Sequence, residues 1–466
     1  MQKSFLLILL LSRAWVTLAQ QPASAPYRAT PWQVNDLVHT RLAVRFDYAK
    51  RYLYGQEWVT LKPHGVATDS LRLDAKGMDI KAVALMQSAT STPLKYDYNQ
   101  QQLLIQLGRR IPAGESYTIY LDYTAKPDEL DAQGSAAIGA AKGLYFINPD
   151  SAVAGKPVQI WTQGETESNS AWFPTIDKPN QKTTTEISLT VPARYVTLSN
   201  GALTSRTPTG PGQRTDTWRL DEPCAPYLVM LAVGDFRIAR DTWRGKEVSY
   251  YLEPQYAAQA RAIFGQTPAM LAFFSQRLGV DFPWNKYSQI VCRDYVAGAM
   301  ENASASLFGE QAQGSARELL DWEYAGVERE IAHELFHHWF GDYVTCESWS
   351  NLTMNESFAN FSEVLWAEHA HGPDAGAEQA ERSRRTYLRD PTNYPKPLVR
   401  FRYVDKEDMF DNVTYQKGGS ILNMLRAELG EEVFFKGLQR YLTQNAFGTG
   451  EPHQLRLAWK KPRAAT

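Results

Sequence analysis

Two histidines and a glutamate constrain the fold of this chain more than any other feature of its sequence. His333 and His337 frame the segment His-Glu-Leu-Phe-His, and Glu356 follows after eighteen intervening residues. Histidines four positions apart on a helix lie on one face, so both imidazoles can bind one metal ion. A catalytic zinc takes three protein ligands and keeps a fourth position for water. We therefore predict a second helix, over residues 351–366, that runs back and brings Glu356 to the metal.

The residues around this motif favour a buried helix. Residues 331–340 are rich in apolar and aromatic side chains. A buried helix does not carry His, Glu and His without partners, because unpaired buried charge is costly. The alternative, two surface histidines on a solvated helix, is therefore disfavoured. We predict one zinc ion per chain with His333, His337 and Glu356 as ligands, and Glu334 as the base that takes a proton from water.

Composition limits the classes of function. The formal net charge is −2, so nothing indicates binding to nucleic acid or to an anionic membrane surface. The three cysteines, Cys224, Cys292 and Cys346, allow at most one disulfide, and their spacing does not suggest a metal knuckle. We expect each of them to be a small buried apolar side chain.

The first nineteen residues have the pattern of a signal peptide. Lys3 provides the positive charge, residues 5–11 form the apolar core, and Thr17-Leu18-Ala19 offers a cleavage site. The apolar run is too short to span a bilayer, and no second candidate span follows. We predict a signal peptide over residues 1–19 and an exported protein, periplasmic or secreted, without a membrane span.

The hydrophobic pattern divides the mature chain into two parts. From about residue 35 to residue 240, short runs alternate apolar and polar between turn residues, which is typical of an all-β domain. Residues 132–156, rich in Ala and Gly, are expected to form an exposed loop. We predict a β domain over 20–240 and a second, largely helical domain over 241–466. The expected helices cover residues 256–278, 316–341, 351–371, 375–388 and 418–429.

A second motif lies just upstream of the histidines and allows a resemblance to be stated. The segment Gly298-Ala299-Met300-Glu301-Asn302 follows a predicted strand over residues 289–295. Together with the His-Glu-x-x-His motif and Glu356, it resembles the gluzincin zinc aminopeptidase family of aminopeptidase N and leukotriene hydrolase. The resemblance runs from about residue 35 to about residue 458. It implies an N-terminal all-β, saddle-like domain followed by a thermolysin-like α+β zinc peptidase domain.

The resemblance also implies roles for residues outside the metal motif. Tyr415 is expected to donate a hydrogen bond to the developing oxyanion. Glu301 and Glu165 are expected to bind the protonated amino group, which makes the substrate a peptide with a free N-terminus. The leukotriene hydrolase branch carries Gln where this chain has Glu165, so Glu here favours peptidase activity. The remaining residues expected to bind substrate are Gly298, Ala299, Met300 and Asn302.

Two residues of the second helix keep two interpretations open. Asn360 and Glu363 lie four and seven residues after Glu356, on the same helical face. They can be hydrogen-bond partners of a ligating histidine, or they can belong to an exposed, solvated face. The spacing alone does not separate these interpretations.

The C-terminus departs from the pattern of the family that the chain resembles. Residues 453–461 begin an amphipathic helix with Leu455, Leu457 and Trp459. Similar proteins carry further helices here, so the chain reads as C-terminally shortened. We expect these apolar side chains to have few packing partners.

Three functions follow from the sequence. The first is a zinc aminopeptidase that releases N-terminal residues from peptides. The second is a non-catalytic or inactive truncated relative, against which the retention of all five metal and catalytic positions argues. The third is a thermolysin-like endopeptidase, which Glu301 and Glu165 disfavour because an endopeptidase has no free amino group to bind.

Overall fold

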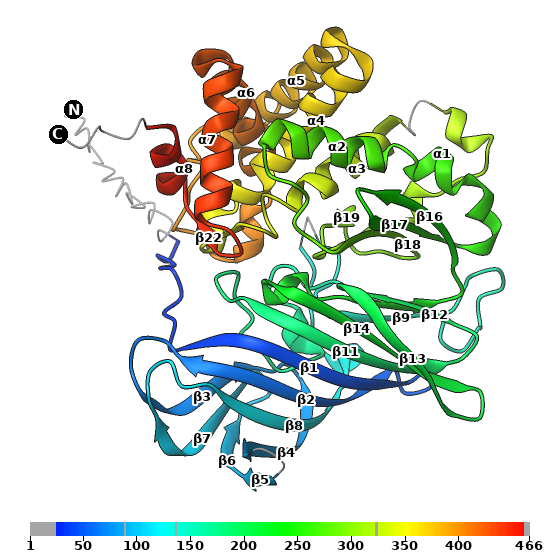
Figure 1. Cartoon of the computed structure of the whole chain (residues 1–466), viewed down its shortest axis with the longest axis vertical. Helices are drawn as coiled ribbons and strands as arrows, with labels where there is room; N and C mark the ends of the chain where they lie inside the picture. Colours follow the sequence, from blue (N-terminus) through cyan, green and yellow to red (C-terminus); the bar gives the residue numbers. More distant parts are fainter. Residues whose placement is uncertain (1–24, 88–89, 136–137, 322–324, 461–466) are drawn as a thin grey trace, which may run out of the picture.

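The structure is a computed structural model that describes residues 25–87, 90–135, 138–321 and 325–460. Figure 1 shows a β-rich N-terminal half below a helix-rich C-terminal half. The predicted signal peptide, residues 1–19, lies outside the described residues. No helix within the described residues is long and apolar enough to cross a membrane.

The N-terminal half is built on a large twisted sheet with strand order β13-β14-β11-β1-β2-β8-β4-β5, beside a smaller sheet β3-β7-β6. Strand β11 alternates strictly between buried and partly exposed residues, because one of its faces packs on the core. The strands of the two sheets are β1 (Asn35–Asp47), β2 (Tyr52–Pro63), β3 (Thr68–Asp74), β4 (Met78–Gln87), β5 (Thr90–Pro93), β6 (Lys95–Tyr98), β7 (Gln102–Ile111), β8 (Tyr117–Ala125), β11 (Thr183–Pro192), β13 (Ala202–Gly210) and β14 (Gln213–Cys224).

A third sheet, of order β12-β15-β10-β9, completes the β-rich N-terminal half. Its strands are β9 (Leu144–Ile147), β10 (Gln159–Thr162), β12 (Val196–Ser199) and β15 (Leu231–Gly234). The prediction of an exposed loop over residues 132–156 is wrong for β9, whose four residues are buried. A four-residue strand that is buried on both faces has no alternating pattern, so the Ala and Gly around it masked it.

The C-terminal half contains a mixed sheet of order β16-β17-β18-β20-β19, with β19 at its edge. Its strands are β16 (Arg237–Trp243), β17 (Lys246–Leu252), β18 (Lys286–Cys292), β19 (Ala299–Met300) and β20 (Ala305–Gly309). Strand β19 runs antiparallel to β20, and β18 runs parallel to both β17 and β20. The domain boundary predicted between residues 240 and 241 falls within β16.

The helices are α1 (Ala260–Phe264), α2 (Thr267–Leu278), α3 (Ala325–His337), α4 (Thr353–His371), α5 (Pro373–Leu388), α6 (Gly418–Leu429), α7 (Glu431–Gln444) and α8 (Pro452–Trp459). The helix predicted over 418–429 is confirmed as α6. The helix predicted over 256–278 is instead a 3-10 turn (Pro254–Gln259) followed by α1 and α2, and Pro268 lies at the start of α2, where its missing N–H is tolerated. Helix α7 was not predicted.

The helix that carries the two histidines is shorter than predicted. The sequence predicts a helix over 316–341, whereas α3 begins at Ala325 and ends at His337. Gly341 follows with a φ of +138°, a backbone conformation that favours glycine. The chain therefore turns directly after His337 and leads through β21 (Thr345–Cys346), which pairs with β22 (Thr449–Gly450), toward α4.

Helix α8 is packed more fully than the sequence predicts. Leu455 is buried, and Trp459 stacks on Phe434 of α7, with ring centroids 5.6 Å apart. The Trp459 indole also donates a hydrogen bond of 3.0 Å to the carbonyl of Phe434. Only Leu457 of the three apolar residues is exposed, so the prediction of few partners is wrong for Leu455 and Trp459. All three cysteines are free and buried, as predicted.

Candidate metal centre and substrate cleft

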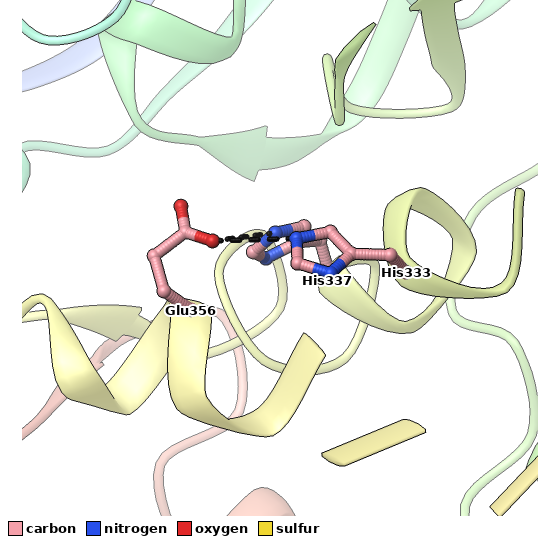
Figure 2. Close-up of side chains that lie close together, drawn as sticks. All are labelled: His333, His337 and Glu356. Atoms are coloured by element: carbon pink, nitrogen blue, oxygen red, sulfur yellow. Dashed lines mark ion pairs between the residues drawn. The ribbon is translucent and has the colours of Figure 1, made fainter. Parts of the chain in front are cut away.

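Helices α3 and α4 pack side by side and bring the three predicted ligands together. His333 and His337 lie one turn apart on α3, and Glu356 lies in the first turn of α4. The Ser362 hydroxyl of α4 donates a hydrogen bond of 3.1 Å to the carbonyl of Ala332, which joins the two helices. Figure 2 shows the two imidazoles and the Glu356 carboxylate meeting at one point.

The donor atoms of this group have the spacing that zinc requires. Glu356 Oε2 lies 3.4 Å from His333 Nε2 and 3.4 Å from His337 Nε2. A tetrahedral zinc with bonds of about 2.0–2.1 Å places its ligand atoms roughly 3.4 Å apart. Glu356 Oε2 is buried and has no hydrogen-bond partner among the described residues, so a bound cation would satisfy it. The residues therefore fit a zinc ion.

The Nδ1 atoms of both imidazoles lie within hydrogen-bond distance of other groups. His333 Nδ1 lies 2.9 Å from Glu363 Oε1, and His337 Nδ1 lies 3.0 Å from the carbonyl of Phe340. Donation from each Nδ1–H leaves Nε2 free to bind a metal. Glu363 is thus a partner of a ligating histidine, whereas Asn360 contacts Glu363 and not an imidazole. Of the two interpretations left open by the sequence, the structure favours the first.

The charged groups at the centre shift one another's pKa values. Burial raises the pKa of Glu334 to about 8, although both imidazoles act in the opposite direction. Burial lowers the pKa of His337, but the carboxylates of Glu301 and Glu356 outweigh it and bring that pKa to about 9. Burial disfavours an ionised Glu356, yet His337 and His333 hold its pKa at about 2. The pKa values of Glu356 and His337 are therefore shifted in opposite directions by the attraction between these two groups.

Two further carboxylates converge on the same place from different elements. Glu165 follows β10 of the N-terminal half, and Glu301 follows β19. One carboxylate oxygen from each of Glu165, Glu301 and Glu356 lies within 4.8 Å of the others. Glu165 Oε1 and Glu301 Oε1 are buried without a hydrogen-bond partner among the described residues. Burial, and then the neighbouring Glu301 carboxylate, raises the pKa of Glu165, and a cation bound beside these carboxylates would favour their ionised forms.

Tyr415 reaches the centre from a third direction. It lies in a π-helical turn (Val413–Lys417) directly before α6. Its ring stacks on that of His333, with centroids 6.1 Å apart and planes 13° apart. Burial, and then the carboxylate of Glu356, raises the pKa of Tyr415, so its hydroxyl keeps its proton and can donate a hydrogen bond.

These groups line one cleft of about 710 Å³. Gly298, Ala299 and Glu301 of the Gly-Ala-Met-Glu-Asn segment line it, but Met300 and Asn302 do not. That Met300 and Asn302 bind substrate stays a prediction; both residues are buried, and Met300 Sδ accepts a hydrogen bond from Gln163. Successive residues of an extended segment face opposite sides, which separates Ala299 and Glu301 from Met300 and Asn302.

Sequence reasoning missed several residues of the cleft. Glu330 and Arg329 of α3 line it, together with Gln163 and Phe410. Glu330 and Arg329 carried a usable signal, since they lie four residues before Glu334 and His333 on the same helix. Gln163 and Phe410 come from distant segments, and no local sequence pattern predicts that these segments pack against the cleft.

The fold and the metal centre together define the class: a two-domain protein with a metallopeptidase architecture, in which a β-rich domain supplies part of the cleft of a helix-rich domain. The model of the Peptidase M1 N-terminal domain matches residues 36–228, and that of the Peptidase family M1 domain matches residues 263–465. The chain belongs to peptidase family M1.

Individual proteins agree with this assignment. The chain is 31% identical to aminopeptidase N of Streptomyces lividans, over 67% of this chain and 37% of that protein. It is also 31% identical to human glutamyl aminopeptidase, over 72% of this chain and 38% of that protein. A probable aminopeptidase 1 of Sulfurisphaera tokodaii is 27% identical, over 89% of this chain and 50% of that protein. The chain thus spans about half the length, or less, of these curated relatives.

A solved structure shares the whole architecture. It is a mutant of an M1 zinc metallopeptidase from Deinococcus radiodurans with a Tyr-Ser-Ala substrate bound. The TM-score is 0.75, and the match covers 92% of this chain and 91% of that chain at 22% sequence identity. The similarity confirms the predicted fold class, a β-rich domain followed by a helix-rich catalytic domain.

Proposed function

We propose that this chain is a zinc-dependent aminopeptidase that binds one zinc ion and releases N-terminal residues from peptides. The observation that carries the proposal is the position of Glu165 and Glu301. Their unpaired carboxylate oxygens lie beside Glu356, so a cation-binding group adjoins the metal centre in one cleft. The aminopeptidase names of the curated relatives support it.

The surroundings of each catalytic group suit one role in peptide hydrolysis. A zinc ion at His333, His337 and Glu356 would polarise the scissile carbonyl and lower the pKa of a bound water. Glu334 takes the proton of the attacking water and passes it to the nitrogen of the leaving amine. The Tyr415 hydroxyl donates a hydrogen bond to the oxyanion that develops as the water attacks.

The amino-group site fixes which bond is cleaved. Glu301 and Glu165 bind the α-ammonium group of the substrate, which places the first peptide bond at the metal centre. A substrate without this positive charge leaves both carboxylates buried and unpaired. The alternative, a thermolysin-like endopeptidase, has no use for such a pair.

The experiment compares a free peptide with its N-acetylated form. We expect the purified chain, loaded with zinc, to cleave an aminoacyl chromogenic amide and the free peptide. On acetylation kcat/KM should fall by at least about fivefold, since an unpaired buried charge costs roughly 1–3 kcal/mol. Equal rates on both peptides would favour the endopeptidase. Absence of hydrolysis with one zinc bound would favour the inactive relative.

We also propose that the protein is exported to the periplasm or the medium. The charged, apolar and small-residue pattern of residues 1–19 supports this proposal. N-terminal sequencing of the protein purified from its native cells tests it. A mature chain that begins near Gln20 is expected, and a chain that retains Met1 in the cytoplasm would contradict it.

A further inference from the structure

Glu330 is a charged residue of the cleft to which the proposed mechanism assigns no task. It lies on α3, one turn before the general base Glu334, and it lines the cleft. Among the described residues its carboxylate has no hydrogen-bond or ion-pair partner. Burial raises the pKa of Glu330, while His333 and Arg329 oppose that effect. A partly buried, unpaired carboxylate in a cleft is a site for a positively charged group.

Two other charged residues that line the cleft, Arg329 and Glu318, have partners of their own. Arg329 Nε lies 3.5 Å from Glu363 Oε2. Glu318 accepts a hydrogen bond of 2.6 Å from the backbone N–H of Ser315. Arg329 is paired with Glu363 and forms no ion pair with Glu330 among the described residues, so the charge of Glu330 remains available to a bound peptide.

The position of Glu330 relative to β19 indicates which part of a peptide it meets. A Cβ placed on Gly298 would lie 3.0 Å from Glu330 Oε1, so this carboxylate lies against the start of the edge segment. A peptide that pairs antiparallel with this edge, with its ammonium group at Glu301, runs from Glu301 toward Gly298. It therefore runs toward Glu330.

The distance along α3 indicates which residue of a bound peptide can reach Glu330. Four residues of an α-helix rise about 6 Å, so the backbone of Glu330 lies roughly that far along α3 from that of Glu334, the proposed base. The next Cα of the peptide lies about 3.8 Å beyond the preceding one, and a lysine or arginine side chain spans the remaining distance. The residue directly after the scissile bond is thus the one whose side chain reaches Glu330.

We propose that Glu330 is a specificity-determining residue that selects peptides with Lys or Arg directly after the bond that is cleaved. This inference rests on the proposed aminopeptidase function, because that function fixes the direction of the peptide. The substrate class is that of peptides with a free N-terminus and a basic second residue.

The first experiment measures kcat/KM on three peptide amides, Leu-Lys-Ala, Leu-Gln-Ala and Leu-Glu-Ala, whose second residues have similar lengths and different charges. We expect the parent protein to prefer Lys over Gln by about tenfold, the effect of one charged hydrogen bond, and to disfavour Glu. Glu330→Gln should bring the Lys-to-Gln ratio near one. Glu428→Gln, which removes an exposed charge on α6, serves as the matched control and should keep the parent ratio.

A binding measurement gives a second result that does not depend on turnover. In a Glu334→Gln background, calorimetry should show tighter binding of the Lys peptide than of the Gln peptide, and adding Glu330→Gln should abolish the difference. The preference should also weaken as salt is raised, because the pair is only partly buried. Equal affinities for both peptides in the Glu334→Gln protein overturn the assignment.

The outcomes separate this inference from the function on which it rests. If no free peptide is cleaved, the aminopeptidase proposal fails. If all three peptides are cleaved at equal rates, only the role of Glu330 fails. A preference for Glu at the second residue would also overturn it, because Arg329 would then dominate the charge of this part of the cleft.

Discussion

The cleft and the β domain both contain buried carboxylate oxygens without a hydrogen-bond partner among the described residues, and the two regions differ in what surrounds the carboxylate. In the cleft, oxygens of Glu165, Glu301 and Glu334 have no hydrogen-bond partner among the described residues. The two imidazoles act on the pKa values of Glu301 and Glu334, and all three carboxylates line an open volume of about 710 Å³. In the β domain, both oxygens of Glu57 also have no such partner. Burial and lack of hydrogen bonds are therefore shared by both regions and do not by themselves mark a site.

Glu57 has none of the groups that give the cleft its chemistry. It lies on the buried face of β2, opposite Leu42 of β1 and Leu121 of β8 in the strand register. Burial alone raises its pKa well above the usual range, with no imidazole or other cation contributing. The nearby Tyr123 hydroxyl is likewise buried and unpaired among the described residues. Glu57 is thus a neutral acid in an apolar core, whereas the cleft carboxylates are poised toward cations.

The comparison teaches that a functional carboxylate is identified by what converges on it. Glu356 is the clearest case, because two imidazoles hold its pKa at about 2 despite full burial. Substitutions should therefore have opposite consequences in the two regions. Loss of a charge in the cleft should lower activity, and replacement of the Glu57 carboxyl group by an apolar side chain should raise stability.

The largest expected effect is that of His337→Ala. Removal of one of three protein ligands should release the zinc and bring hydrolysis of an aminoacyl amide below detection. Metal content after dialysis, measured by mass spectrometry, checks this. His453→Ala, which changes an exposed histidine on α8, should retain one zinc per chain. Stoichiometric zinc in the His337→Ala protein would break the assignment of the metal centre.

Glu334→Gln should lower kcat by about 10²–10⁴-fold, the range for loss of a general base, while zinc remains bound. Steady-state kinetics together with metal analysis measure both quantities. If Glu334 were merely a buried acid like Glu57, this substitution would leave kcat unchanged. That result would remove the difference between the two regions.

Tyr415→Phe should lower kcat by about 10²-fold and change KM little, because its hydrogen bond forms mainly in the transition state. The separate values of kcat and KM on one chromogenic amide test this expectation. Tyr394→Phe, at a half-exposed position, is the control. A loss that appears only in KM would assign Tyr415 to substrate binding.

The smallest expected effect is a pH-dependent change in the free energy of unfolding of the β domain. The folded pKa of Glu57 is raised, so the neutral form's contribution is fully present below the unfolded pKa of about 4.5 and is lost as pH rises toward the folded value. As pH rises from the unfolded toward the folded pKa, Glu57→Leu should therefore gain stability relative to the parent, by at most about 1.4 kcal/mol per pH unit. Urea unfolding at pH 5, 6, 7 and 8 measures the difference, with Gln56→Leu on the exposed face as control. Parallel pH profiles of parent and Glu57→Leu would show that Glu57 does not titrate as its burial implies.

Much of the metal centre was predictable because it depends on local periodicity. The spacing of His333 and His337 places them on one face of any helix, and the returning helix needed only to carry Glu356. The role of Glu363 was visible as one of two interpretations. The start of α3 and the existence of β9 were not visible, since a short buried strand and a helix start without a clear cap leave little pattern in the sequence.

The sequence by itself determined the family, the order of the two domains and the identity of the three candidate ligands, because each depends on motifs and on repeats of 2 or 3.6 residues. Only the tertiary structure decided that Glu165 and Tyr415 meet the metal centre, that Met300 and Asn302 turn away from the cleft, and that Glu330 lies against Gly298. It also decided that Glu57 has no counter-charge. These outcomes depend on how segments far apart in the chain pack, and the burial of a charge and the presence of its partner are properties of that packing.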